Sequence, residues 1–418
     1  MNSAPQRDTP AGLASALAWL TARRLRGQAM VLAVCLWATC AVDFATSGIF
    51  DRAGNVKFQD FLPLYISGKM IAQGRAGELY NQRAVANEIG TAVHNPARVI
   101  LPMLYGPQVG LLFAPLSALS FSTAAWLWTT ASLLAFFVCI YLAWRVCPGL
   151  RPHARVVAIA AVAFPPLFHF FVRGQLSVLV LLCFTLAFLA LRADRCWLTG
   201  IAFGLLVFKP QFLLAVPLIL LLSGPWKTFA GLTFSAAAQI ALAWFRFGSA
   251  VMGTYFDSLW HASRWIGAAE PGLAPIQMHS LRSFWTLLIP WPEAALVVYI
   301  LSSIVVIGVA AAVWKSPSPL ALRFSSLILA AVLTNPHLFV YDLLVLAPAI
   351  LLLVDWALTH PQHWYSAVFL LLSYLVFVST LFGPLSRWTH FQLSVPVFVA
   401  LLWILWRSST DVAPRLAH

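Results

Sequence analysis

The sequence predicts an all-α, polytopic transmembrane protein, and three observations carry that prediction. The chain has 418 residues, of which 61% are hydrophobic and only 9% are charged, whereas soluble proteins carry about 25% charged residues. Many apolar runs reach about 20 residues, the length that crosses a bilayer as a helix. Runs such as LSVLVLLCFTLAFLALR (176–192) are continuously apolar, whereas the strands of a membrane barrel alternate between apolar and polar residues.

The chain divides into a short tail, a membrane domain and a second tail. Residues 1–27 have a polar start and then three arginines, Arg23, Arg24 and Arg26, before the first span. This pattern is not a cleavable signal, and basic residues beside a span favour the cytoplasmic side. We expect a membrane domain at 28–406 and a cytoplasmic tail at 407–418. We count about 11 to 13 spans, with apolar runs at 28–44, 105–119, 121–145, 156–171, 174–191, 197–222, 226–247, 293–314, 320–334, 338–354, 364–381 and 389–406.

Two longer polar segments interrupt the apolar runs, at 45–104 and at 248–292. We expect both to be outward-facing loops. The first contains KFQDFLPLYISGKMIAQGRAGELYN (57–81), which is too polar for a span and too apolar for a plain loop. It is followed by a predicted polar helix at 79–95. No internal repeat, low-complexity tract or soluble domain is evident.

Two topologies are open for residues 105–222. In one, 105–119 and 121–145 are separate full spans. In the other, 105–119 is a short helix that enters the membrane and returns, and 197–222 breaks at Pro210. The second is favoured because it places six basic residues in the cytoplasm, as the distribution of arginine and lysine in membrane proteins predicts. These are Arg145, Arg151, His153, Arg155, Arg192 and Arg195.

The net charge of +13 does not indicate nucleic-acid binding, because the basic residues are scattered through short loops and form no stripe. The six cysteines lie in or beside apolar runs without a CxxC pair. They are typical of small packing residues, not of a disulfide framework or a metal site. We expect no structural metal and no cofactor, while a catalytic metal stays open.

A few ionisable residues lie at span ends or within apolar runs, where an ionisable side chain is a candidate for function. The acids are Asp43, Asp60 and Asp342. Each has an alternative interpretation as a helix cap or a salt-bridge partner.

The cationic candidates are Arg173, Lys209 and His337. Lys209 stands inside GLLVFKPQFLLAVP, where it either snorkels to the interface or marks a broken helix beside a wet cavity. His337 is either a ligand or a capping residue. Acids, cations and amides such as Gln175 on one side of a membrane suggest a lipid phosphate held by cations, with an acid that accepts a hydroxyl proton.

Five short motifs occur in the order typical of glycosyltransferase family 87, which the sequence resembles from about residue 40 to 355. Two positions depart from the family pattern: Gly106 stands where a proline is usual, and Ser177 where an asparagine is frequent. The motifs are Asp60-Phe61…Tyr65…Gly74…Leu79-Tyr80, Tyr105-Gly106-Pro107…Ala114-Pro115-Leu116, Arg173-Gly174-Gln175, Lys209-Pro210-Gln211 and Asn335-Pro336-His337…Tyr341-Asp342.

The resemblance implies a GT-C type enzyme of the bacterial inner membrane with its active site facing the periplasm. It implies that a hexose, mannose foremost, passes from a polyprenyl-phosphate-linked donor to a glycolipid or glycan acceptor, with inversion. The partners are then donor, acceptor and lipid bilayer, without nucleic acid. Segment 57–81 would lie along the membrane surface, with Phe61, Leu64 and Ile71 on the lipid interface.

The resemblance also implies roles for individual residues. Asp60 would be the general base, and the cations Arg173, Lys209 and His337 would neutralise the leaving phosphate. The remaining expected donor-binding residues are Tyr65, Tyr80, Gln175, Gln211, Tyr341 and Asp342. The alternative function is a transporter or flippase of lipid-linked sugars, which would also need buried charge and broken helices. The lack of a repeat and the two covering loops favour the enzyme.

Overall fold

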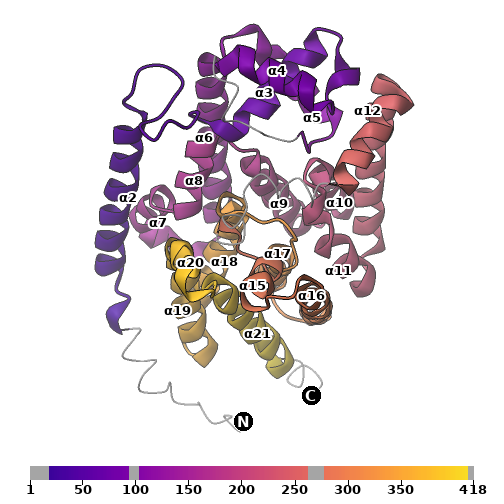
Figure 1. Ribbon diagram of the computed structural model, residues 1–418. Helices are drawn as coiled ribbons and strands as arrows, with labels where there is room; N and C mark the ends of the chain where they lie inside the picture. Colours follow the sequence, from indigo (N-terminus) through magenta and orange to yellow (C-terminus); the bar gives the residue numbers. More distant parts are fainter. Residues whose placement is uncertain (1–17, 94–102, 262–276, 413–418) are drawn as a thin grey trace.

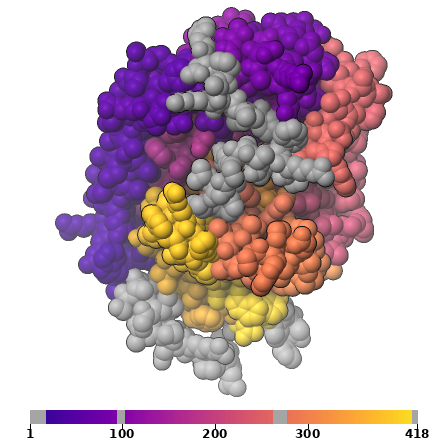
Figure 2. Space-filling view, in the orientation of Figure 1, coloured from indigo at the N-terminus to yellow at the C-terminus, as the bar shows by residue number. Residues whose placement is uncertain are grey.

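The computed structural model describes residues 18–93, 103–261 and 277–412. All regular elements in these ranges are helices, as the sequence predicts, and β-pairing is limited to isolated bridges. The helices of the first loop cover one end of a bundle of longer helices (Figure 1). In the space-filling view this layer, coloured indigo to purple, forms the upper end of the visible face (Figure 2).

Six helical stretches in the described residues are long and apolar enough to cross a membrane, or seven if one bent pair counts as a span. This is fewer than the 11 to 13 spans expected, because four other apolar runs form helices of only 10–17 residues. The long stretches are α2 (Ala22–Phe44), α6 (Phe121–Arg145), α12 (Trp226–Trp260), α16 (Pro292–Lys315), Val340–Thr359, which includes α18 (Leu346–Thr359), and Trp364–Thr389, which includes α19 (Trp364–Ser379).

The bundle is completed by shorter helices. The bent pair joins η5 and α7 to α8 at an angle of 43°. Its proline-rich joint at 165–166 agrees with the general cause of such kinks. The shorter helices are η5 (Pro148–His153), α7 (Ala154–Val162), α8 (Pro165–Arg173), α9 (Ser177–Arg192), α10 (Cys196–Gly204), α11 (Ala215–Ser223), α17 (Leu320–Leu333), α20 (Ser386–Thr389) and α21 (Ser394–Val412).

The predicted break at Pro210 is confirmed. After α10 ends, two 3₁₀ turns, η6 (Leu205–Phe208) and η7 (Pro210–Leu213), separate it from α11. Proline lacks the backbone N–H that would continue the helix. Lys209 is the residue between the two turns, with φ −128° and ψ 73°, outside helical geometry. The chain therefore reverses direction at Lys209.

Residues 105–119 form no full span. They fold into α5 (Pro107–Phe113) and the 3₁₀ turn η4 (Pro115–Ala118). Seven helical residues extend only about 10 Å, so the two-full-span topology fails here. The short-helix alternative is the one that agrees with the structure.

The first loop is helical, and its polar helix α4 (Gln82–Val93) is confirmed. The helix α3 (Leu62–Ala72), however, does not rest on lipid, so that expectation is wrong. Phe61 and Leu64 are fully buried and Ile71 is nearly so, because α5 packs closely on α3. At Gly68 an added Cβ would lie 2.5 Å from the carbonyl carbon of Phe113. Only glycine allows this approach.

The second expected loop, 248–292, is also partly helical. Helix α12 continues to Trp260 after a kink at Gly248, which has φ 80°. Helix α15 (Leu281–Leu288) lies near the end of the segment. Residues 262–276, like 94–102 of the first loop and the tail segments 1–17 and 413–418, lie outside the described residues.

The basic segments after α6 and α9 lie at the same end of the bundle. Arg192 Nη1 donates to the carbonyl oxygen of Val146 at 3.1 Å. Asp355, near the end of α18, accepts a hydrogen bond from the Gly149 amide at 2.7 Å. The assignment of this end to the cytoplasm stays a prediction.

Candidate active site

Asp60 lies in the 3₁₀ turn η1 (Gln59–Phe61), between the first span and α3. The turn begins after Phe58, whose φ of 56° is left-handed and uncommon for a residue with a bulky side chain. The ring of Phe58 is buried and meets those of Phe44, Trp126 and Phe171 edge-on. Such a backbone persists only where its surroundings hold it, so this aromatic cluster fixes the direction in which Asp60 points.

A second turn, between α8 and α9, faces Asp60. Gly174 ends α8 with φ 71°, and a Cβ there would lie 3.0 Å from that of Phe61. Trp128 Nε1 donates to the Gly174 carbonyl oxygen at 3.1 Å. Glycine is needed both for the left-handed φ and for the close approach to η1. The two turns therefore bring Arg173 and Gln175 to Asp60.

These residues form the first polar cluster, which we call the Asp60 cluster: Asp60, Arg173, Gln175, Tyr105 and Tyr341. Gln175 Nε2 donates to Asp60 Oδ2 at 2.8 Å and to the Tyr341 hydroxyl at 3.3 Å. The Tyr105 hydroxyl donates to Gln175 Oε1 at 3.1 Å. Arg173 Nη1 lies 3.7 Å from Asp60 Oδ1, a charge contact longer than a hydrogen bond.

The Asp60 cluster is accessible at its charged members. The side chain of Asp60 is 14% exposed and that of Arg173 is 31% exposed. A carboxylate that keeps some access to solvent or to a ligand can accept a proton from outside the protein. The cluster thus combines a partly accessible carboxylate with a partly accessible guanidinium.

A second cluster, the Lys209 cluster, consists of Lys209, Asp342 and Ser177. Lys209 Nζ lies 2.5 Å from Asp342 Oδ1 and donates to Ser177 Oγ at 3.2 Å. Ser177 Oγ donates to the same carboxylate oxygen at 2.6 Å. The side chains of Lys209 and Asp342 are only 3% and 2% exposed. For Asp342 the salt-bridge interpretation is therefore the one that the structure shows.

The two clusters adjoin each other through their backbones. Gln175 and Ser177 flank the start of α9, while Tyr341 and Asp342 are consecutive in the 3₁₀ helix η8 (Val340–Val345). Lys209 Nζ also lies 5.5 Å from the centroid of the Tyr341 ring, within the range of a cation–π contact. Only one or two residues of the chain therefore separate members of the two clusters.

His337 lies beside the Lys209 cluster in the turn before η8. Burial lowers the pKa of its imidazole, Asp342 opposes this shift, and the positive charges of Lys209 and Arg282 add to it. The ring is therefore neutral at neutral pH and can donate one hydrogen bond. Its ring meets that of Phe339 edge-on at 4.8 Å.

Two further predicted site residues, Tyr65 and Tyr80, bind backbone carbonyl groups through their hydroxyls. Tyr65 donates its hydroxyl to the Leu119 carbonyl oxygen at 2.8 Å, and Tyr80 donates to that of Tyr105 at 2.9 Å. Tyr80 thus contacts the backbone of a member of the Asp60 cluster, whereas Tyr65 contacts the segment between η4 and α6. Gln211 follows the chain reversal in η7 and has no hydrogen-bond partner among the described residues.

Sequence reasoning did not assign Tyr105, Ser177 or Arg282 to the site. Tyr105 and Ser177 were visible only as motif positions, and Ser177 stood out as a departure from an expected asparagine. The Ser177 hydroxyl forms hydrogen bonds with both members of a buried ion pair, Lys209 and Asp342. A local sequence pattern does not reveal such contacts. Arg282 lies in a segment without a recognisable motif.

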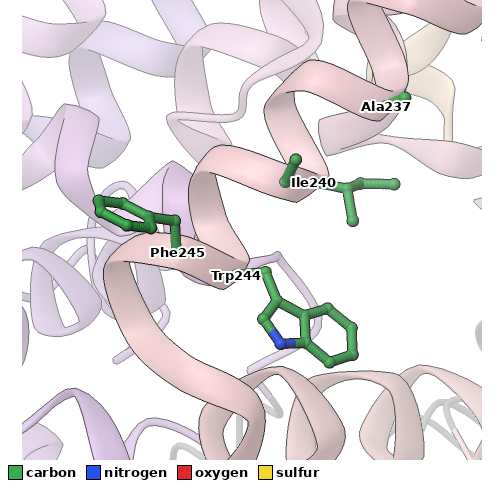
Figure 3. A pocket seen from close by; sticks show the side chains of 5 residues that line it. Ala237, Ile240, Trp244 and Phe245 are labelled. Carbon is green, nitrogen blue, oxygen red and sulfur yellow. The ribbon is translucent and has the colours of Figure 1, made fainter.

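The described residues contain no group of three or more His, Cys, Asp or Glu side chains that could hold a metal ion. One shallow hollow lies on α12, lined by Ala237, Ile240, Ala241, Trp244 and Phe245. Figure 3 shows Trp244 and Phe245 extending away from the helix. Phe245 is 93% exposed. With no ionisable group in its lining, the hollow is typical of a lipid-facing surface and not of a reaction centre.

The fold and the two clusters define a polytopic membrane protein with two acids and two cations in adjoining clusters. The sequence model of glycosyltransferase family 87 matches residues 103–341, which is more than half of the chain. The protein belongs to glycosyltransferase family 87 and is a membrane glycosyltransferase, as the motifs predict. No curated protein and no solved structure matches the chain. The match includes Arg173, Lys209 and His337, whereas Asp60 precedes it.

Proposed function

We propose that the protein transfers a hexose, mannose foremost, from a polyprenyl-phosphate-linked donor to a glycolipid or glycan acceptor. The reaction takes place at the periplasmic face of a bacterial inner membrane, in a GT-C type architecture without a cofactor. The observation that carries this proposal is the Asp60 carboxylate, held by Gln175 beside Arg173 at the membrane-loop boundary. An acid and a cation at that depth suit a donor whose phosphate stays at the lipid surface while its chain remains in the bilayer.

Asp60 is the general base in this proposal. It accepts the proton of the acceptor hydroxyl while the acceptor oxygen bonds to the anomeric carbon. The bond from that carbon to the phosphate oxygen breaks, and polyprenyl phosphate leaves with the bonding electrons. A carboxylate repels the donor phosphate, so the two lie on opposite faces of the sugar. Displacement in this arrangement inverts the anomeric carbon.

Arg173 is the first candidate for the phosphate ligand. Its guanidinium carries five N–H donors, so it can contact a phosphate while it remains near Asp60. Bidentate contacts of this kind are the strongest that a side chain offers to phosphate. His337 donates one hydrogen bond in its neutral form, and Tyr341, Gln175 and Gln211 orient the sugar or the phosphate.

Lys209 has a less direct role than the sequence suggests. Two of the three donors of its ammonium group contact Ser177 and Asp342, and one donor remains. The ion pair of Lys209 and Asp342 has no net charge. Its main effect is therefore to fix the start of α9 against η8. Tyr341 and Gln175, which stand on those two elements, are then fixed beside Asp60.

The proposal is tested with detergent-purified protein and a polyprenyl-phosphate mannose labelled in the sugar. Release of polyprenyl phosphate with a labelled glycolipid product is the expected result. Donors that carry glucose or galactose test the sugar assignment. Movement of intact donor across proteoliposome membranes, without cleavage, would instead identify a transporter. Loss of turnover in Asp60→Asn at unchanged donor affinity ties the activity to this site.

A further inference from the structure

A cavity lies among the described residues, and none of the residues that line it belongs to either polar cluster. It has a volume of about 440 Å³ and lies between α2, α6, η5, α7, α18 and α19. Its lining is apolar apart from four residues, Gln28, His153, Ser373 and Tyr374. Ligand cavities of about 300–1,000 Å³ with apolar walls and a few polar groups are typical of small-molecule sites.

The cavity reaches the end of the bundle opposite to Asp60. Leu150 and His153 of η5 and Leu358 near the end of α18 line it, and Gly149 is hydrogen-bonded to Asp355 of α18 at that end. Asp60 lies beside Gln175, just before α9, whose 16 residues lead to this same end. Those residues extend about 24 Å. The cavity is therefore a site of its own.

One wall of the cavity is α2, a helix at the edge of the bundle (Figure 1). Gln28 of α2 accepts a hydrogen bond from the Tyr374 hydroxyl of α19 at 3.2 Å. Beyond the cavity, Trp37 of α2 donates from Nε1 to the Val162 carbonyl oxygen at 3.0 Å, so the helix is attached to the bundle there. Most of α2 is nevertheless exposed, which gives a chain-shaped molecule access to the cavity from the bilayer.

Ser373 places a hydroxyl without a hydrogen-bond partner among the described residues in this lining. Its side chain is 1% exposed and its hydroxyl has no hydrogen-bond partner among the described residues. A buried hydroxyl without a partner is unfavourable. A ligand with an ester or hydroxyl oxygen at this depth would satisfy it.

Basic residues stand beside the cavity lining at its open end. Arg23, Arg24 and Arg26 alternate with the lining residues Ala22 and Leu25, and Arg151 and Arg155 flank His153. Asp355, the acid that contacts η5, already accepts hydrogen bonds from two backbone amides. The mouth is therefore positively charged, and clusters of arginine beside a membrane span attract anionic lipid headgroups.

We propose that this cavity is a binding site for an anionic glycerophospholipid. One acyl chain fills the apolar space between α2, α7 and α19, its ester oxygen meets Ser373, and the phosphate lies against the arginines of α2 and η5. By contacting both α2 and the helices that face it, the lipid stabilises the packing of α2 on the bundle. This site does not depend on the proposed sugar transfer.

The test is native mass spectrometry of the purified full chain after delipidation. The protein is reloaded with phosphatidylglycerol or with phosphatidylcholine of the same acyl chains. We expect the wild-type protein to retain one phosphatidylglycerol, at least tenfold in preference to phosphatidylcholine, and to melt at a higher temperature with it. Ala160→Phe, which fills the cavity, loses this adduct. Ala237→Phe, on the outer face of α12 (Figure 3), retains it.

A charge variant tests the headgroup assignment without altering the cavity. The double variant Arg151→Gln/Arg155→Gln is expected to lose much of the preference for phosphatidylglycerol, with only the arginines of α2 remaining, while Lys227→Gln/Lys315→Gln, at helix ends away from the cavity, keeps the full preference. Equal retention of the two lipids by the wild-type protein overturns the proposal. So does retention by Ala160→Phe that matches Ala237→Phe, or lipid binding that begins only after residues 1–17 are removed.

Discussion

The Asp60 cluster and the Lys209 cluster use similar groups in opposite ways. Asp60 and Arg173 are partly exposed, and their charges lie 3.7 Å apart. Asp342 and Lys209 are almost fully buried, and their charges lie 2.5 Å apart. A loose, accessible pair can exchange its partner for a ligand, whereas a tight buried pair cannot be opened without stranding a charge. From this comparison we propose that the first cluster carries the chemistry and that the second holds its neighbours in position.

The largest effect is expected for Asp60→Asn. The amide keeps the size of the side chain but cannot accept the acceptor proton, and general-base catalysis contributes about 10²–10⁴-fold. Turnover should fall by that factor, measured as product formed per folded protein, while donor affinity is unchanged. Asp51→Asn, nine residues before Asp60 in the same loop, is the matched control and should keep normal turnover.

Lys209→Ala tests the other side of the comparison. It leaves Asp342 buried without its partner, which costs about 3–5 kcal/mol. The melting temperature and the folded yield should fall, and Lys227→Ala on the surface should change neither. Lys209→Met/Asp342→Leu, which removes both charges, should recover much of the loss. If Lys209→Ala is as stable as the wild-type protein, the pair of Lys209 and Asp342 has no structural role.

Arg173→Gln sharpens the assignment of the phosphate ligand. Loss of a charge-assisted hydrogen bond costs about 1.5–3 kcal/mol, or about 10–150-fold. Donor KM should rise by such a factor, with a smaller change in melting temperature than for Lys209→Ala. Arg52→Gln, at an exposed arginine of the first loop, serves as the control. If Arg173→Gln keeps a normal donor KM, Arg173 is not the phosphate ligand. Arg282 is then the next cation to test in that role.

The smallest effect concerns the layer that carries Asp60. Hydrogen bonds from Arg75 and then Lys69 hold the pKa of Glu88 below its usual value of 4.5, and they join α4 to α3. A lowered folded-state pKa stabilises the protein above the unfolded value, and the contribution is lost as the pH falls through the folded value. The protection factors of the α4 amides in hydrogen exchange should therefore fall below about pH 4.5. Glu88→Gln should remove this pH dependence.

The sequence predicted most of the helices and the break, but not how the pieces meet. Helix α16 begins and ends within one residue of its apolar run, and Pro210 marks the chain reversal, because length and proline are local signals. The burial of α3 was missed because an apolar face does not reveal whether lipid or protein covers it. The contact of Lys209 with Asp342 joins residues 133 positions apart, which no short pattern encodes.

The central claim is that Asp60 removes a proton during transfer, and azide tests it most directly. Azide is an anionic nucleophile without a proton, so it needs no base. With the labelled donor, Asp60→Ala should regain sugar release on addition of azide and form a glycosyl azide of inverted configuration, whereas Asp342→Ala should not respond. Folded Asp60→Ala that azide fails to rescue, or an Asp342→Ala that azide does rescue, would contradict the account.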